Sequence, residues 1–129
     1  QLASADFLSA LPMRLLSLPK GAQAVVGHIE RAWSYAFDWP GTQAELSTFE
    51  NTLRALMHGD YRLGHAMEFF SERFAALSVA LNSQLDDVNL GANIDDILLS
   101  QLWMASNDAR NYLVLGDPAA RLGSSKTVR

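Results

Sequence analysis

The side chains that could do chemistry in this sequence are few, and their spacing does not assemble a complete catalytic set. The three histidines are His28, His58 and His65, and no acidic pair stands at metal-ligand spacing from them. Gly59-Asp60 interrupts the helix that would place His58 and His65 on one face. His28 ends a predicted strand, where a histidine is more often held by neighbouring polar groups than used as a general base. The residues by themselves therefore predict no metal site, no cofactor and no general base.

The acidic residues and the absent cysteine narrow the chemistry further. The sequence contains no cysteine, which excludes disulfides, thiolate metal sites and a cysteine nucleophile within this chain. Asp95 and Asp96 precede a predicted helix, where the helix dipole favours negative charge by roughly 0.3–1 kcal/mol. The turn Gly116-Asp117-Pro118 lacks the glycine-rich run and the lysine of a phosphate loop. We expect Asp117 to accept hydrogen bonds from backbone N–H groups of its own turn.

Composition places the chain among ordinary globular domains. It has 129 residues, of which 49% are hydrophobic and 19% are charged. A net charge of -4 and scattered cations argue against nucleic acid as a partner, and no apolar run reaches the roughly 18 residues of a membrane span. Residues 1–11 also lack the basic start of a secretory signal. The length is within that of one domain, and we expect residues 1–122 to belong to a single domain of which they are a part, followed by a polar tail over residues 123–129.

Two segments, residues 22–28 and 111–116, predict β-strands, and nearly everything between them predicts helix. Both are short apolar runs without strict alternation, which is typical of strands buried on both faces of a parallel sheet. Two such strands rarely form a stable sheet alone. The sequence therefore predicts an α/β domain of two strands plus three or four helices, with a sheet completed by residues that are not in this chain.

The predicted helices follow apolar spacing and capping signals. A helix over residues 5–17 should kink at Pro12. A capping box of Thr42 and Glu45 should open a helix that runs to about residue 58. A long helix should cover residues 60–83, and a third should begin at Asn93 or Asp95. Residues 83–93 are predicted as a polar loop, and residues 105–110 as a connector.

Each of the three later helices has an apolar stripe, and the stripes of the second and third are predicted to be buried. Their members are Leu46, Phe49, Leu53, Leu56 and Met57 in the first; Leu63, Met67, Phe70, Phe74, Leu77 and Leu81 in the second; and Ile94, Ile97, Leu98, Leu102 and Trp103 in the third.

Residues 29–41 form a predicted aromatic-rich loop at the carboxyl end of the first strand. In open α/β sheets ligands bind at this edge, so Trp33, Tyr35 and Phe37 are candidates for a pocket wall. The other interpretation is that these aromatic side chains simply close the end of the sheet, and the residues alone favour that interpretation.

Two segments together resemble a known family. Residues 21–37 (GAQAVVGHIERAWSYAF) resemble the strand and loop after the catalytic cysteine strand of caspase-like cysteine peptidases, closest to the gingipain-like and CHAT-type branches. Residues 107–122 (NDARNYLVLGDPAARL) look like the last strand and the terminal Gly-Asp-Pro turn of the same domains. The resemblance implies the C-terminal part of a caspase-like αβα sandwich, in a cytoplasmic protein.

The resemblance also implies a function. The family cleaves peptides with a His/Cys dyad, which here would lie on strands before residue 1, and His28 does not match that histidine. The loop after the first strand helps to wall the pocket for the substrate P1 side chain. Trp33 matches its aromatic residue, with Glu30, Arg31 and Ser34 around it. Glu30 would suit a basic P1 group and Arg31 an acidic one, so specificity stays open.

The implied partners are the N-terminal part of the same peptidase domain and a peptide or protein substrate. The alternative function is a noncatalytic interaction or scaffold module derived from such a domain, in which the long helix over residues 60–83 and its neighbour form a surface for a partner. A self-contained helical domain is a third interpretation. An upstream strand ending in Cys-Gly, after another ending in His-Gly, would favour the peptidase.

Overall fold

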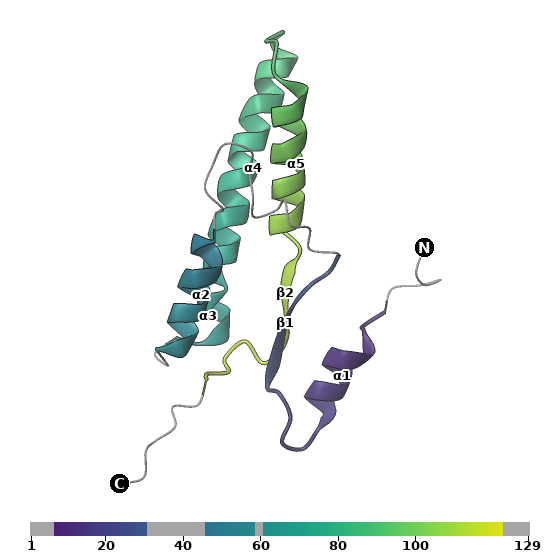
Figure 1. Cartoon of the computed structure of the whole chain (residues 1–129), viewed down its shortest axis with the longest axis vertical. Coiled ribbons are helices and arrows are strands. Elements are labelled where there is room, and N and C mark those ends of the chain that lie inside the picture. The colour runs from purple at the N-terminus through teal and green to yellow at the C-terminus, as the bar shows by residue number, and fades with distance from the viewer. Residues whose placement is uncertain (1–6, 31–45, 59–60, 123–129) are drawn as a thin grey trace.

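The computed structural model describes residues 7–30, 46–58 and 61–122, and it is mixed α and β as predicted (Figure 1). The elements in chain order are α1 (Ala10–Ser17), β1 (Ala24–His28), α2 (Ser47–Met57), α3 (Leu63–Ala66), α4 (Glu68–Asn89), α5 (Asp96–Ala109) and β2 (Tyr112–Gly116). The predicted tail and the Thr42–Glu45 capping box lie outside the described residues.

A long antiparallel hairpin of α4 and α5 dominates the molecule and extends away from the sheet (Figure 1). The 22 residues of α4 span about 33 Å. Asp95 caps α5 as predicted, because its Oδ1 accepts a hydrogen bond from the Ile97 N–H at 2.9 Å. Gly91, with φ of 88°, provides the left-handed conformation in the turn between the two helices.

The predicted loop over residues 83–93 is wrong, because α4 continues to Asn89. Leu85 and Val88 extend the apolar spacing of Leu81, and pairing with α5 stabilises these turns. The predicted connector over residues 105–110 is wrong for a related reason. Ala105 and Ala109 are buried, and their small side chains let α5 continue against its neighbour.

Several predicted boundaries and buried faces also differ. Helix α1 begins at Ala10, so Pro12 falls in its first turn, where it needs no kink. The long predicted helix divides at Met67 into α3 and α4. Each helix has neighbours on only part of its surface, so some of its large apolar side chains are exposed and several of the buried ones are alanines. The residues predicted as buried that are exposed are Phe74, Ile97, Leu98 and Trp103, and Leu46, Leu53 and Met57 of the first apolar stripe are exposed as well.

The sheet has two strands among the described residues, and they pair antiparallel, so the parallel pairing suggested by their apolar pattern is wrong. The register places Ala24 opposite Gly116 and His28 opposite Tyr112. An apolar pattern records burial but not strand direction. Direction follows here from the path of the chain through the helices, which returns β2 alongside β1 in the opposite sense.

The core lies where one face of this sheet meets α3 and the first turns of α4. Leu63, Met67 and Phe70 are buried there, as predicted for the long helix. The half-buried side chains packed against them are Ala24, Phe49, Leu56, Tyr112 and Val114. Tyr112 is central, because its ring lies 4.4 Å from that of Phe70 and 5.7 Å from that of Phe49.

The Gly116-Asp117-Pro118 turn fastens the end of β2 to α3. Asp117 Oδ1 accepts from the Ala119 N–H at 2.8 Å, as predicted for this side chain. The N–H groups of Leu63 and Gly64, which no carbonyl of their own helix can reach, donate to Ala120 O and Pro118 O. The turn therefore provides hydrogen-bond acceptors for the first N–H groups of α3 as well as for its own backbone.

Gly116 is the position of this turn that tolerates least change. Its φ is 104°, and a Cβ there would collide with the Gln23 carbonyl and lie 3.0 Å from Ala24 Cα. We expect Gly116→Ala to lower the free energy of unfolding by about 1–3 kcal/mol, measured by urea denaturation. Gly27→Ala is the matched control, since a Cβ at Gly27 meets no atom within 4 Å. Equal losses in the two variants would contradict this account.

Candidate functional site

The predicted pocket residues are only partly placed by the structure. Arg31, Trp33 and Ser34 lie outside the described residues, and Glu30 is the last residue described before them. The Glu30 carbonyl accepts a hydrogen bond from His28 Nδ1 at 2.7 Å. The structure thus defines where this segment leaves the sheet, at the carboxyl end of β1.

His28 joins this point to the end of α5. Its Nε2 lies 3.2 Å from Asp108 Oδ1 and 3.2 Å from the Asp108 carbonyl. The side chains of His28 and Asp108 are 9% and 8% exposed. Both ring nitrogens face acceptor oxygens. A neutral imidazole can donate a hydrogen bond from only one of its nitrogens, whereas a protonated ring can donate from both.

This geometry decides what His28 can do. A general base needs a ring nitrogen within reach of the proton that it removes. Both nitrogens of His28 are occupied by Glu30 and Asp108, and no side chain of the described residues offers a thiol. The expectation that neighbouring polar groups hold His28 is confirmed.

Tyr112 forms the apolar wall of the same cluster. Its ring lies edge-on to the His28 ring at 4.8 Å. Burial raises the pKa of the Tyr112 hydroxyl above 10.0, the negative charge of Asp108 raises it further, and the positive charge of Arg73 opposes them. The hydroxyl therefore stays protonated over the physiological range.

Arg73 and Asn111 complete a buried polar cluster with His28, Asp108 and Tyr112. Asp108 Oδ2 and Asn111 Nδ2 are buried, and within the described ranges neither has a hydrogen-bond partner. Asp108 Oδ2 can therefore accept, and Asn111 Nδ2 can donate, a hydrogen bond in addition to those within the cluster.

Sequence reasoning missed Arg73, Asp108, Asn111 and Tyr112 as members of this site. His28 and Asp108 are 80 residues apart, so spacing could not reveal their contact. One signal was present: Asp108 follows Ala105 by three residues and so lies near it on one side of the helix, which is unusual for a solvated acid.

The other histidines belong to different surroundings. His65 stacks on Tyr61 with ring centroids 4.7 Å apart and approaches Glu68 Oε2 at 3.2 Å on the surface. His58 is exposed at the end of α2. Across residues 7–30, 46–58 and 61–122, no three His, Cys, Asp or Glu side chains gather as metal ligands would.

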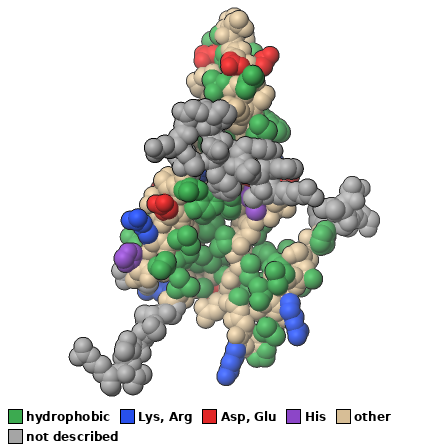
Figure 2. All heavy atoms as spheres, in the orientation of Figure 1, with side chains coloured by type: hydrophobic (Ala, Val, Ile, Leu, Met, Phe, Trp, Pro, Cys, Tyr) green, Lys and Arg blue, Asp and Glu red, His purple; other side chains and the backbone are tan. Residues whose placement is uncertain are grey.

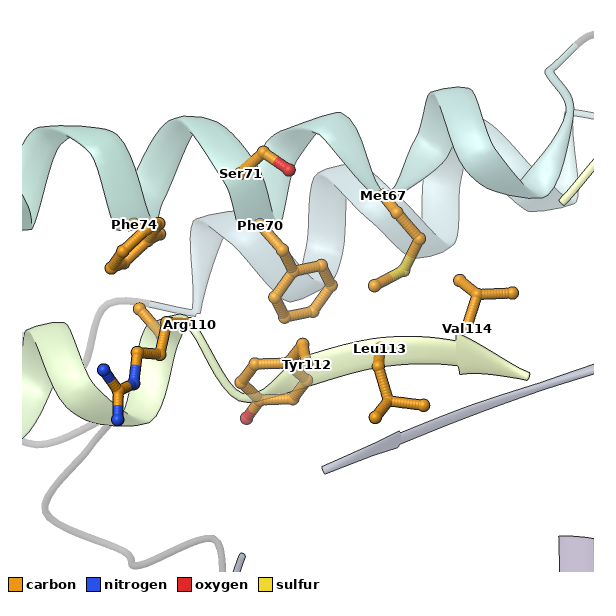
Figure 3. A pocket seen from close by; sticks show the side chains of 9 residues that line it. Met67, Phe70, Ser71, Phe74, Arg110, Tyr112, Leu113 and Val114 are labelled. Carbon is orange, nitrogen blue, oxygen red and sulfur yellow. The ribbon is translucent and has the colours of Figure 1, made fainter. Parts of the chain in front are cut away.

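Beside the polar cluster, a pocket of about 120 Å³ lies between α4 and the outer edge of β2 (Figure 3). Phe70 projects from α4 towards β2, and Phe74 projects towards Arg110 at the end of α5. Three consecutive residues, Tyr112 to Val114, line it together. Because neighbouring side chains of a strand point to opposite faces, this arrangement places the pocket at the strand edge.

Comparison with known proteins identifies no relative: no protein-family model, no curated protein and no solved structure matches this chain. Within the described part of the chain, every helix is too short or too polar to cross a membrane.

The raised pKa of Tyr112 predicts how stability depends on alkaline pH. Stability from the protonated Tyr112 should be fully present below pH 10, where the unfolded side chain ionises, and should be lost as pH rises through the higher native pKa. The tyrosinate absorbance of the chain minus that of Tyr112→Phe should give a midpoint above 10. Asp108→Asn should lower this midpoint, whereas Asp86→Asn, on exposed α4 surface, should not. A midpoint insensitive to Asp108→Asn would contradict the proposed electrostatics.

Proposed function

We propose that this chain is part of a cysteine endopeptidase of the caspase/gingipain-like type, with the His/Cys dyad outside the chain. In this proposal β1 and β2 belong to a larger sheet of a caspase-like αβα sandwich. The segment with Trp33 walls the P1 pocket, and the partner is the N-terminal part of the same domain. The observation that carries the proposal is the outer edge of β2, which pairs with no other strand among the described residues.

The register shows which backbone groups stand at that edge. Ile29 N donates to Asn111 O, and Asp117 N donates to Gln23 O. In an antiparallel ladder, residues alternate between bonding to the partner strand and facing away from it. The N–H and C=O groups of Tyr112 and Val114 therefore point away from β1.

An open edge of this kind favours pairing with another strand. The neighbouring pocket adds two apolar side chains from α4, the buried Phe70 and the exposed Phe74, so an added strand would find both hydrogen-bond partners and an apolar layer beside it. Two strands alone are also a marginal sheet. These features support a third strand beside β2. In the proposal, the upstream part of the domain supplies this strand.

The polar cluster supports the second part of the proposal. A substrate pocket needs a wall whose starting point is held, because misplacing a contact by about 1 Å can cost a hundredfold in rate. His28 ties the Glu30 carbonyl to Asp108, so the segment that carries Arg31, Trp33 and Ser34 starts from a fixed position. Trp33 would supply a flat apolar face to the P1 side chain.

The strand-edge part of the proposal predicts a pattern of amide exchange. In this chain alone, the N–H groups of Tyr112 and Val114 should exchange rapidly, because no strand of the described residues pairs with the outer edge of β2. In the complete source protein they should exchange at least about tenfold more slowly. Leu113 and Leu115 are internal controls, since their N–H groups face β1 in both samples. Unchanged exchange at Tyr112 and Val114 would refute a third strand.

The pocket part predicts a change in catalysis. In the complete protein, Trp33→Ala should lower kcat/KM by about tenfold or more and alter P1 preference, measured with a panel of peptides. Trp103→Ala removes an exposed indole from the helical hairpin and should leave both unchanged. Iodoacetamide should stop the cleavage in each active variant. If Trp33→Ala keeps rate and preference, the P1 assignment is wrong; if the complete protein cleaves no peptide, the scaffold alternative replaces the peptidase.

A further inference from the structure

A continuous groove runs along one side of the α4–α5 hairpin, away from the sheet. It consists of two hollows of about 290 and 280 Å³ that share Leu81 and Trp103. The hollow nearer the sheet also includes Phe74, Ser78 and Arg110. The hollow nearer the helical turn also includes Leu85, Leu99 and Met104.

The groove has the dimensions and chemistry of a helix-binding surface. From Phe74 to Leu85 it follows α4 for about 17 Å, or three helical turns. Trp103 lines both hollows and is 57% exposed, so its indole is available to a partner. A groove between two antiparallel helices accepts the apolar face of a third helix.

The charge near the helical turn is one-sided, whereas Arg110 lines the hollow nearer the sheet. From Ala75 to Asn107 there are four aspartates and no lysine, arginine, histidine or glutamate. Asp96 lies one turn before Ser100 and on the same face of α5 as Trp103, and Asp86 follows Leu85 directly. Figure 2 shows acidic side chains gathered at the end of the hairpin. The hollow nearer the turn is therefore apolar with an acidic rim.

We propose that this groove binds a basic amphipathic helix of a partner protein. Apolar side chains of that helix occupy the two hollows on either side of Trp103, and its Lys or Arg residues lie at Asp86 and Asp96. The charge pattern excludes an acidic helix, because like charges would meet at the rim. It also disfavours a second α4–α5 hairpin, which carries the same aspartates. The inference does not rest on the peptidase proposal, although the groove meets the strand-edge pocket at Phe74 and Arg110.

A designed Leu/Lys amphipathic peptide of about 14 residues, three to four turns long, is the probe. Fluorescence anisotropy of the labelled peptide should show binding to the 129-residue chain, weakened by added salt. A Leu/Glu peptide with the same apolar face should not bind. Trp103→Ala should weaken binding of the Leu/Lys peptide at least about tenfold, as loss of a central tryptophan does in other interfaces. The double variant Asp86→Asn, Asp96→Asn should weaken it and reduce its dependence on salt.

Val79→Ala is the matched control, because Val79 is 69% exposed on a different face of α4. This variant should bind the peptide as the unchanged chain does. Circular dichroism of each variant checks that the helices remain. Equal binding of the Leu/Lys and Leu/Glu peptides would overturn the proposal, as would full affinity in Trp103→Ala. A further result would also overturn the proposal, in favour of a second copy as the occupant. This result is that the chain associates with itself, that Trp103→Ala abolishes the association, and that the Leu/Lys peptide does not compete with it.

Discussion

The packing of Tyr112 against Phe70 is the interaction on which the rest of the described structure depends. Tyr112 begins β2 and Phe70 lies near the start of α4, so their contact at 4.4 Å holds the sheet to the helical layer. Phe49 brings α2 to the same place, with its ring 5.0 Å from that of Phe70. No large side chain of the described residues is fully buried. Because the core is small, each of these aromatic contacts contributes a large part of the stability of the fold.

The same tyrosine relates the core to the polar cluster. Its ring faces Phe70 and also stands edge-on to His28, so the apolar packing sets the position of the histidine ring. Asp108 and Arg73 act on its hydroxyl with opposite sign. The carboxyl end of β1 and the end of α5 are thus joined through His28 and Asp108, next to the point where the Trp33 segment departs. Structural constraint and proposed pocket share one location.

The α4–α5 hairpin follows a different rule. Ala105 and Ala109 bring the helices together through small side chains, and Ser78 and Ser106 meet through their hydroxyls at 3.3 Å. Because small residues form the contact, larger ones such as Trp103, Leu98 and Ile97 are displaced to the surface. The pairing that stabilises the hairpin therefore also creates its exposed apolar groove. An interaction surface arises there without any additional element.

Local signals in the sequence determined the positions of both strands within two residues, the Asp95 cap, the burial of Leu63, Met67 and Phe70, and the role of Asp117 in its turn. These features depend on side chains close together in the chain. Strand direction, the extension of α4 to Asn89 and the pairing of His28 with Asp108 depended on tertiary structure, because each needs a neighbour distant in sequence. The exposed Trp103 shows the same limit: periodicity identified an apolar residue, but only the close approach of two helices through alanines decided that it would face outward.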